Sequence, residues 1–530
     1  MIEDTINQLL LHSPALIVAI PLLGAFLTPL VGKIGPRVRN GFVVFIALLT
    51  SFFVFLLAND IITNQSIRTY SFGAANPDTV VVRILFEVDA MNALMIIIGA
   101  ILVIVSVIYS LKYIQDNTGL DKFYTLVLLM SAGMFGMMMT GDMFNFFVFL
   151  EITSIAASAL IAFWTSKGQS VYAGLKYMVI STIGALFILF AIALLYSQYN
   201  ALNMAVLANA IQYSFLDKIA LVLLVSGLAM KAGVVPMHMW MPDAYGRAPS
   251  SISILLVGAT LASIYALFRV IFTIFGNALA YPMNNIPEVN LALMLGILLV
   301  ALAVITIIVG VMMALKQSDF KRLIAFAAVA EIGYMLLAAG AAVSTLSVNQ
   351  GVMSLTVSGE TALKGGIFHI LNDALDVSLL FLVAGSIYYA TKETSLNKMG
   401  GLARNMKYTT IFFLIGLFAV AGMPPLNGFA SKLMIYQSTY QVNPILAIVA
   451  ILCSILLLAM FVKVFHSAFL GPKIPKFDGV KEVPKTMLIA MGIIACIIIF
   501  IGLFPDLVMN NIVEPAANAL YNHGLYIGGI

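Results

Sequence analysis

The chain has 530 residues, of which 62% are hydrophobic and only 9% are charged, and its mean hydropathy is +1.06. An ordinary soluble domain is about 25% charged, so this composition excludes a soluble globular protein and predicts a polytopic membrane protein. The formal net charge of +4 is small, and nucleic acid is not an expected partner.

Apolar windows bounded by charged residues, glycine, proline or asparagine predict an all-α chain of about fourteen membrane-spanning helices, because about 20 mainly apolar residues cross a bilayer. The N-terminal stretch MIEDTINQLLLHSP is acidic where a cleavable signal peptide is basic, so the first apolar run is predicted to be a retained span. Short links leave no room for a sizeable soluble domain, and no cofactor or metal is predicted. The predicted spans are 14–32, 41–58, 90–111, 123–140, 143–164, 171–195, 217–236, 248–275, 290–315, 322–343, 361–390, 408–438, 443–470 and 486–510.

Basic residues are distributed unevenly over the predicted loops. Most of them fall in alternate loops, whereas the remaining loops hold Arg68, Arg83 and Lys218. The positive-inside rule then predicts a multi-pass protein of the cell membrane with both termini outside the cytoplasm. Arg269 lies near the end of a predicted span, and we expect its side chain to snorkel to the interface.

Two predicted spans are interrupted at comparable places in the two halves of the chain. The seventh breaks at AGVVP directly after Lys231, and the twelfth breaks around Gly422, Pro424 and Pro425, just before Lys432. Paired interruptions of this kind indicate an inverted-repeat transporter and its ion site. A proline kink that serves packing alone is the alternative, but a lysine beside each break favours an ion pathway.

Ionisable side chains inside apolar spans are the candidate functional residues. A charge near the bilayer centre costs at least about 2.5 kcal/mol on insertion scales, so each one suggests a function and a partner. Glu151, alone in FNFFVFLEITSIAASALIAF, is the expected partner of Lys231. Their spread over several helices favours a proton relay over a metal centre or a catalytic triad. The candidates are Glu151, Lys231, Glu331, His369, Asp373, Asp376 and Lys432.

Some of these residues also allow a structural interpretation. In FHILNDALDVSLLF, His369, Asp373 and Asp376 are spaced i, i+4 and i+7, which predicts one helical face, and this face is either a relay or a hydrogen-bonded structural cluster. Glu331 is either a relay group or a capping or pairing group. Asp142, at the end of a methionine-rich run, is expected to cap a helix or lie in the interface rather than take part in transport.

The segment HMWMPDAYGRAP follows the first break on the predicted cytoplasmic side. Its charged residues Asp243 and Arg247, together with His238, fit either a surface pair or the mouth of a cytoplasmic half-channel. Both interpretations are open from the sequence.

Four strings carry a resemblance to a known family: TGDMFNFFVFLE, AMKAGVVPMHMWMPDAYGRAPSSIS, LKQSDFKRLIAFAAVAEIGYM and GMPPLNGFASKL. They resemble the antiporter-like subunits shared by respiratory complex I, the Mrp cation/proton antiporters and the archaeal membrane-bound hydrogenases and sulfane reductases. The resemblance implies two inverted five-helix repeats, each with a broken helix. It divides the chain into 1–122 (helices 1 to 3), 123–275 (first repeat), 290–470 (second repeat) and 471–530 (helix 14 and tail).

The resemblance also implies roles for individual residues. Glu151 and Lys231 match the paired carboxylate and lysine of the first half, Lys432 matches the lysine of the second half, and His369 matches a histidine on the eleventh helix.

The chain departs from the family pattern at two central positions. Leu261, in GATLASIYA, and Val377, in DALDVSLLFL, stand where family members usually carry a titratable residue. Acids stand instead at Glu331, Asp373 and Asp376, so we expect either an acidic path suited to protons or to a hard cation such as Na⁺, or a subunit that transmits conformation without a complete channel.

The function implied by the resemblance is that of a proton- or cation-translocating subunit of a multisubunit membrane complex. Its expected partners are the lipid bilayer, other membrane subunits and a soluble redox arm. The driving reaction would be a ferredoxin-linked hydrogenase or sulfane reductase, or the chain would act in an Mrp-type Na⁺/H⁺ antiporter. The alternatives are a stand-alone secondary transporter and a non-pumping structural or coupling subunit.

Overall fold

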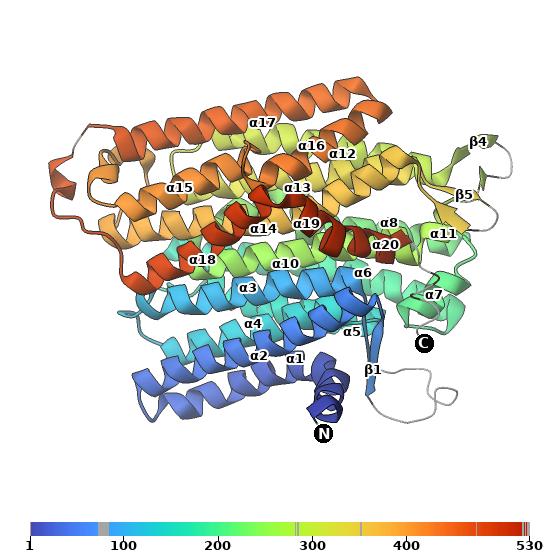
Figure 1. Cartoon of the computed structure of the whole chain (residues 1–530), viewed down its shortest axis with the longest axis horizontal. Helices are drawn as coiled ribbons and strands as arrows, with labels where there is room; N and C mark the ends of the chain where they lie inside the picture. The colour runs from blue at the N-terminus through green and yellow to red at the C-terminus, as the bar shows by residue number, and fades with distance from the viewer. Residues whose placement is uncertain are drawn as a thin grey trace.

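The computed structural model describes residues 2–72, 84–280, 282–283, 286–349, 352–472, 474–521, 524 and 526. Within these ranges the chain is almost entirely helical, as predicted, and the long helices run side by side along the longest axis of the molecule (Figure 1). Arg83, which was predicted to lie in an outward loop, falls outside the described residues.

The first half of the chain forms a bundle of long helices followed by the first broken helix. Its long helices are α1 (Ile2–Gly32), α2 (Pro36–Asn64), α3 (Ala90–Tyr113), α4 (Leu120–Met139), α5 (Met143–Ile161), α6 (Gly168–Tyr199), α8 (Phe215–Ala232) and α10 (Ser250–Phe268). Shorter elements are α7 (Met204–Ala210), η2 (Met237–Trp240), α9 (Met241–Arg247), the π-helix η3 (Arg269–Ile274) and α11 (Gly276–Ala280).

The second half continues with further long helices and the second broken helix. Its main helices are α12 (Leu291–Leu315), α13 (Phe320–Ser344), α14 (Val357–Thr391), α15 (Lys407–Val420), α16 (Asn427–Val442), α17 (Pro444–Val464) and α18 (Lys485–Leu503). Shorter elements are η4 (Leu396–Lys398), η5 (Leu402–Arg404), η6 (Phe465–Leu470), η7 (Pro475–Phe477), α19 (Pro505–Val508), η8 (Met509–Val513) and α20 (Glu514–Tyr521).

Short antiparallel hairpins occupy some of the links between helices. In the described part of the chain they pair β1 (Arg68–Phe72) with β2 (Ile84–Val88), β3 (Pro282–Met283) with β4 (Ile286–Asn290), and β5 (Ser347–Asn349) with β6 (Val352–Ser354). In the first hairpin Arg68 lies opposite Val88 and Phe72 lies opposite Ile84. In Figure 1, β4 and β5 lie at the right-hand end of the bundle, and we call this the hairpin end.

The predicted spans agree closely with the observed helices. Within the described residues, thirteen helical segments are long and apolar enough to cross a membrane. They correspond to every predicted span except 408–438, which is divided into α15, with 14 residues, and α16, with 16 residues. The chain is therefore a multi-pass, all-α membrane protein whose predicted twelfth span is a broken helix.

The two breaks have the same backbone design. Gly233 ends α8 with φ +78°, and Gly422 follows α15 with φ +72°, a conformation that favours glycine. Side chains bind the backbone groups that each break leaves without a helical partner. The Trp240 indole donates to the Met230 carbonyl at 3.0 Å, and the Lys432 ammonium donates to the Val420 carbonyl at 2.7 Å. The likeness agrees with the predicted repeats, whose boundaries at 123–275 and 290–470 stay predictions.

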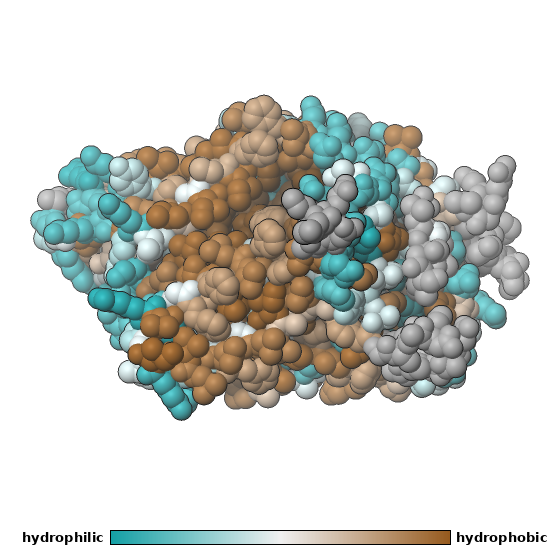
Figure 2. Space-filling view, turned by 60° about the horizontal axis from the view of Figure 1, so that its bottom comes forward, coloured by the Kyte–Doolittle hydropathy of each residue, from teal (hydrophilic) through white to brown (hydrophobic). Residues whose placement is uncertain are grey.

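The most deeply buried helices lie at the centre of the bundle. The apolar stretches of α10, α13 and α14 are buried throughout, whereas only 39% of each of those of α12, α17 and α18 is buried. On the face in Figure 2, hydrophobic residues form a broad band in the middle, and hydrophilic residues gather toward the two ends of the long axis. This is the surface expected of a protein surrounded by lipid, with α13 and α14 placed where polar groups are shielded from it.

The prediction that Arg269 snorkels is wrong. Its side chain is 2% exposed, and its guanidinium lies 2.7 Å from one oxygen of Asp89 and 2.8 Å from the other. It also lies over the ring of Tyr526, 4.8 Å from the ring centre. Because Asp89 is 180 residues away in the sequence, analysis of the single span could not show that a buried counter-charge was present.

Candidate ion-translocation site

The candidate residues gather into two clusters, and the first contains Lys231 and Glu151. The Lys231 ammonium lies 3.7 Å from Glu151 Oε1, which confirms that the two residues are partners. It also donates to the hydroxyls of Ser154 at 2.7 Å and Ser181 at 2.6 Å. The Lys231 side chain is 5% exposed and that of Glu151 is 26% exposed, so the carboxylate lies closer to the surface of the chain than the ammonium does.

Local structure explains why Lys231 occupies this position. It lies in the last turn of α8, where a positive charge interacts favourably with the helix dipole. Gly227 and Gly184 allow α8 and α6 to approach closely, because a Cβ atom on Gly227 would come within 2.7 Å of the Gly184 carbonyl oxygen. This close approach places Ser181 of α6 within reach of the ammonium group.

The second cluster is centred on Glu331 of α13. One carboxylate oxygen lies 2.8 Å from the Lys432 ammonium, and the other lies 2.9 Å from His369 Nε2. All three side chains are at most 3% exposed. Glu331 lies in the middle of α13, so it does not cap that helix, and it pairs with both basic groups. The Lys432 ammonium also lies 4.6 Å from the centre of the Tyr334 ring.

Neutral polar side chains extend this cluster along α14 and α16. His369 Nδ1 lies 3.1 Å from the Ser431 hydroxyl, and Asn372 donates to the same hydroxyl at 2.9 Å. Asn427, the first residue of α16, donates to Asp376 at 3.0 Å and to Asn372 at 3.1 Å. The second break therefore begins a continuous hydrogen-bonded network that runs from Asp376 to Glu331.

Asp373 lies on the same buried helix but stands apart from this network. Its side chain is 4% exposed, and its Oδ1 atom is buried without a hydrogen-bond partner. It is close enough to Tyr245 for the two groups to interact electrostatically. A buried carboxyl oxygen without a partner is costly, so Asp373 is a poor structural element and a candidate proton-exchange group.

The region between the clusters contains hydroxyl groups where the central titratable residues are missing. Leu261 and Val377 are both buried. Beside Leu261, the Thr260 hydroxyl lies 2.7 Å from the Tyr245 hydroxyl. A cavity of about 20 Å³, whose lining includes Lys231, Ser154 and Thr260, lies next to this pair. That volume is sufficient for about one water molecule.

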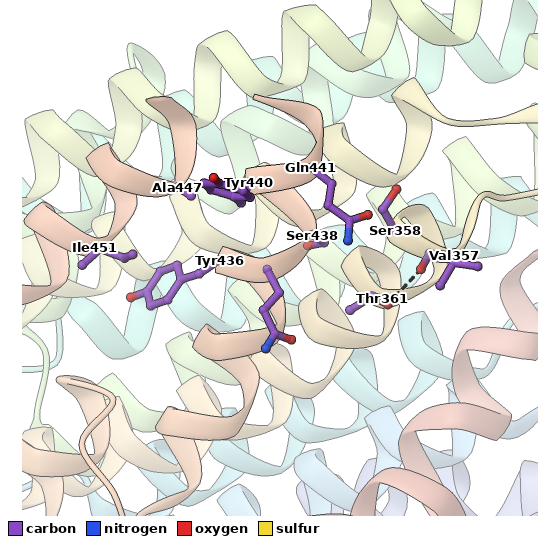
Figure 3. A pocket seen from close by; sticks show the side chains of 10 residues that line it. Val357, Ser358, Thr361, Tyr436, Ser438, Tyr440, Gln441, Ala447 and Ile451 are labelled. Atoms are coloured by element: carbon purple, nitrogen blue, oxygen red, sulfur yellow. Dashed lines mark hydrogen bonds between the residues drawn. The ribbon is translucent and has the colours of Figure 1, made fainter. Parts of the chain in front are cut away.

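A larger cavity of about 440 Å³ is lined by residues of α14, α16 and α17 (Figure 3). It lies where α14 begins and α16 ends, toward the hairpin end. Tyr436 lines it and is four residues after Lys432, which is one helical turn. Other polar residues in its wall are Ser358, Thr361, Gln437, Ser438 and Gln441. A residue of the cavity wall thus lies one helical turn along α16 from Lys432.

The end of the bundle opposite the hairpins carries a network of ion pairs. Asp243 lies 2.7 Å from Lys176 and 3.3 Å from Arg322, and Arg247 lies 3.5 Å from Asp319. Asp243 and Arg247 thus form ion pairs, as one of the two sequence-based interpretations expected, whereas His238 is buried and takes no part in them. The half-channel interpretation stays a prediction.

Two carboxyl groups outside the spanning helices have altered acidity. Burial raises the pKa of Glu87, in β2, to about 8, although the neighbouring Arg269 opposes this shift. Burial also raises the pKa of Asp142 to about 6, against hydrogen bonds from backbone amides. Asp142 accepts from the Asn145 amide at 2.7 Å and caps α5, which confirms its predicted role.

The sequence did not indicate the neutral partners of the site. Ser154, Ser181, Asn427, Thr260 and Tyr245 belong to residue types that also occur throughout membrane helices for packing. One signal was available, since Asn427 lies in PPLNG at the break itself. In the described residues no group of three or more His, Cys, Asp or Glu side chains is arranged to hold a metal ion.

The fold and the paired buried charges define a class of protein, the antiporter-like subunits of ion-translocating membrane complexes. Residues 140–458 match the family described as NADH:quinone oxidoreductase/Mrp antiporter, transmembrane. This match covers more than half of the chain, and the chain belongs to that family.

Individual relatives agree with this assignment. The chain is 31% identical to NADH-quinone oxidoreductase subunit N of Desulforudis audaxviator, over 95% of this chain and 98% of that protein. It is 32% identical to one of the Na⁺/H⁺ antiporter subunits of Alkalihalophilus pseudofirmus, over 82% of each. A chain of the membrane-bound sulfane sulfur reductase, an archaeal respiratory membrane complex, superposes with a TM-score of 0.84 and 27% identity, covering 98% of this chain and 99% of that chain.

Proposed function

We propose that this chain is a proton-translocating subunit of a multisubunit complex in the cell membrane, driven by a partner reaction elsewhere in the complex. The observation that carries the proposal is the buried triad of Glu331, His369 and Lys432, in which one carboxylate is shared by two bases at 2.8 and 2.9 Å. Such a triad can pass a proton between its members with little movement of heavy atoms. The relatives that act in quinone-reducing, antiporting and sulfane-reducing complexes support the membership of a larger assembly.

The geometry favours a proton over Na⁺. A hard cation needs several oxygen ligands at once, but in both clusters a lysine ammonium already occupies the space beside the carboxylate. A second cation there would meet the repulsion of that ammonium group. A proton, in contrast, needs no separate binding site, because its transfer only changes which side chain of the cluster carries the charge.

The two clusters are proposed to be linked through hydroxyl groups. A proton leaving Lys231 would pass through a water in the adjoining cavity to Thr260, then to Tyr245, and then to Asp373. A further water would carry it from Asp373 to His369, which is four residues earlier on the same helix. The 2.7 Å contact between the Thr260 and Tyr245 hydroxyls supports this order. The path replaces the titratable groups that family members usually carry where this chain has Leu261 and Val377.

Glu151 is the proposed point of coupling to a neighbouring subunit. Its side chain is 26% exposed, so a partner charge can approach it from outside the chain. A change in that charge would shift the pairing of Glu151 with Lys231 and release or bind a proton. The cavity beside Tyr436 is proposed to connect the second cluster to the side of the membrane that the positive-inside rule predicts to be extracellular.

The test is ion transport by the intact complex in liposomes without Na⁺, followed with a pH-sensitive dye. We expect proton movement without Na⁺, loss of that movement in Lys432→Met, and a several-fold decrease in Thr260→Val. Lys463→Met, at an exposed residue of α17, is the control. If transport strictly requires Na⁺, and Lys432→Met abolishes a flux of Na⁺, then the transported ion is Na⁺ and the proposal of proton transport is wrong.

A further inference from the structure

A second large cavity lies at the end of the bundle opposite the hairpins, away from both clusters. It has a volume of about 270 Å³ and lies among the ends of α3, α6, α9, α13 and α14. None of the residues of the two clusters lines it. The proposed proton path therefore does not explain why this cavity exists.

Three cationic side chains from separate elements line the cavity. They are Lys167 before α6, Arg247 at the end of α9 and Lys321 at the start of α13. Lys321 is only 5% exposed and donates to the Ala248 carbonyl. In the described part of the chain no acidic side chain lines the cavity. Two carboxylates lie beside lining residues: Asp319 is 3.5 Å from Arg247, and Glu393 accepts from the Thr394 amide at 3.2 Å. The three cations outnumber them.

The start of α6 adds a second, independent source of positive potential. Gly168, Gln169 and Ser170, in its first turn, line the cavity. The first amide groups of a helix have no partner within the helix, and the side chain of the capping residue Lys167 supplies none. The Ser170 amide donates to the Lys167 carbonyl at 2.9 Å, which leaves the amides of Gly168 and Gln169 at the very start of the helix. The positive end of the dipole of this 32-residue helix thus lies at the same cavity as the three cations.

Aromatic side chains hold one of these cations in place. The Lys167 ammonium lies 4.3 Å from the centre of the Trp164 ring and donates to the Tyr388 hydroxyl at 2.6 Å. Trp164 and Tyr388 both line the cavity. Tryptophan and tyrosine favour the level of the lipid headgroups, so the cavity lies where the bilayer meets water.

We propose that this cavity is a binding site for a phosphate group, supplied either by the headgroup of an anionic phospholipid or by a free phosphate ion. A phosphate accepts several hydrogen bonds at once, and it pairs with arginine, with lysine and with the N–H groups of a helix N-terminus. Basic pockets between membrane helices near the cytoplasmic surface are suited to anionic headgroups. An anion here would also relieve the mutual repulsion of Lys167, Arg247 and Lys321.

The experiment measures binding to the purified intact complex after its lipid has been exchanged for a neutral detergent. Phosphatidylglycerol, phosphatidylcholine and inorganic phosphate are each added, and the midpoint of thermal unfolding and the lipids retained in native mass spectrometry are recorded. We expect phosphatidylglycerol or inorganic phosphate to raise the midpoint, and phosphatidylcholine to leave it unchanged. A response to phosphatidylglycerol alone identifies a lipid headgroup, and a response to inorganic phosphate identifies a free ion.

The variant Lys167→Gln/Arg247→Gln is expected to weaken this binding at least tenfold. The control Lys316→Gln/Lys398→Gln removes the same charge from exposed residues that do not line the cavity, and it should bind as the unaltered complex does. If the first double variant fails to assemble, Lys167→Gln alone serves, since it leaves the pair of Arg247 and Asp319 intact. Binding that is absent, or equal in both double variants, would overturn the proposal.

Discussion

Glu331 is the residue whose buried carboxylate contacts two basic groups, Lys432 at 2.8 Å and His369 at 2.9 Å. Glu331→Gln leaves the Lys432 ammonium buried without a counter-charge, which costs about 3 to 5 kcal/mol in comparable buried pairs. We expect that loss in the free energy of unfolding, measured by denaturant titration of the purified complex, together with loss of proton transport.

The double variant Glu331→Gln/Lys432→Met distinguishes the electrostatic explanation from a packing defect. It removes both charges, so most of the lost stability should return while transport stays absent. Equal stability of the single and double variants would show that the unpaired ammonium is not the cause.

Glu87, which lies outside the membrane spans, is expected to make the free energy of unfolding depend on pH. In the folded chain burial raises its pKa to about 8, and in the unfolded chain the pKa is about 4.3. Between these values the folded state binds a proton that the unfolded state releases, so this group makes the unfolding free energy fall as pH rises. The slope is at most about 1.4 kcal/mol per pH unit.

Glu87→Gln should remove this contribution and flatten the decrease in stability between pH 5 and pH 8. The measurement is thermal unfolding of the complex at several pH values, with Asp116→Asn, at an exposed loop carboxyl, as the control. Identical pH profiles for Glu87→Gln and the unaltered protein would contradict the assigned pKa.

Among the elements, the second broken helix is expected to be the most sensitive. Gly422 has φ +72°, and a Cβ atom there would lie 2.9 Å from Lys432 Cδ. Gly422→Ala should therefore lower the unfolding free energy by about 1 to 3 kcal/mol and reduce transport by displacing the lysine. Gly41→Ala, inside α2, has nothing within 4 Å of the added carbon, so it should leave transport unchanged and raise the unfolding free energy by at most about 1 kcal/mol. If Gly422→Ala transports protons as well as the unaltered protein does, the geometry of the break is not required for transport.

The sequence predicted the elements well because their signals are local. Apolar length identified the spans, glycine and proline identified both breaks, and isolated charges in apolar runs identified Glu151, Lys231 and Lys432. Partners that are distant in the sequence were not predictable. Arg269 was expected at the interface because Asp89 is 180 residues away. The contact between Thr260 and Tyr245 could not be predicted, because hydroxyl residues are common in membrane helices and most of them serve packing.

For the whole molecule, two lysine–carboxylate clusters lie on and beside the fully buried central helices, and we propose that neutral polar groups join them. In this proposal the hydroxyl groups take the place of the titratable residues that are missing at Leu261 and Val377. The proposed site of coupling, at the partly exposed Glu151, is then separate from the cavity beside Tyr436. The central claim is that both clusters belong to one path.

The most direct test is the number of protons moved per turnover of the partner reaction, measured in liposomes containing the intact complex with Lys231→Met. That substitution leaves Glu331, His369 and Lys432 untouched, and the exposure of Glu151 limits its cost to stability. The account predicts that the partner reaction continues while the protons moved per turnover decrease by the share that this subunit contributes. An unchanged number in an assembled complex would contradict it.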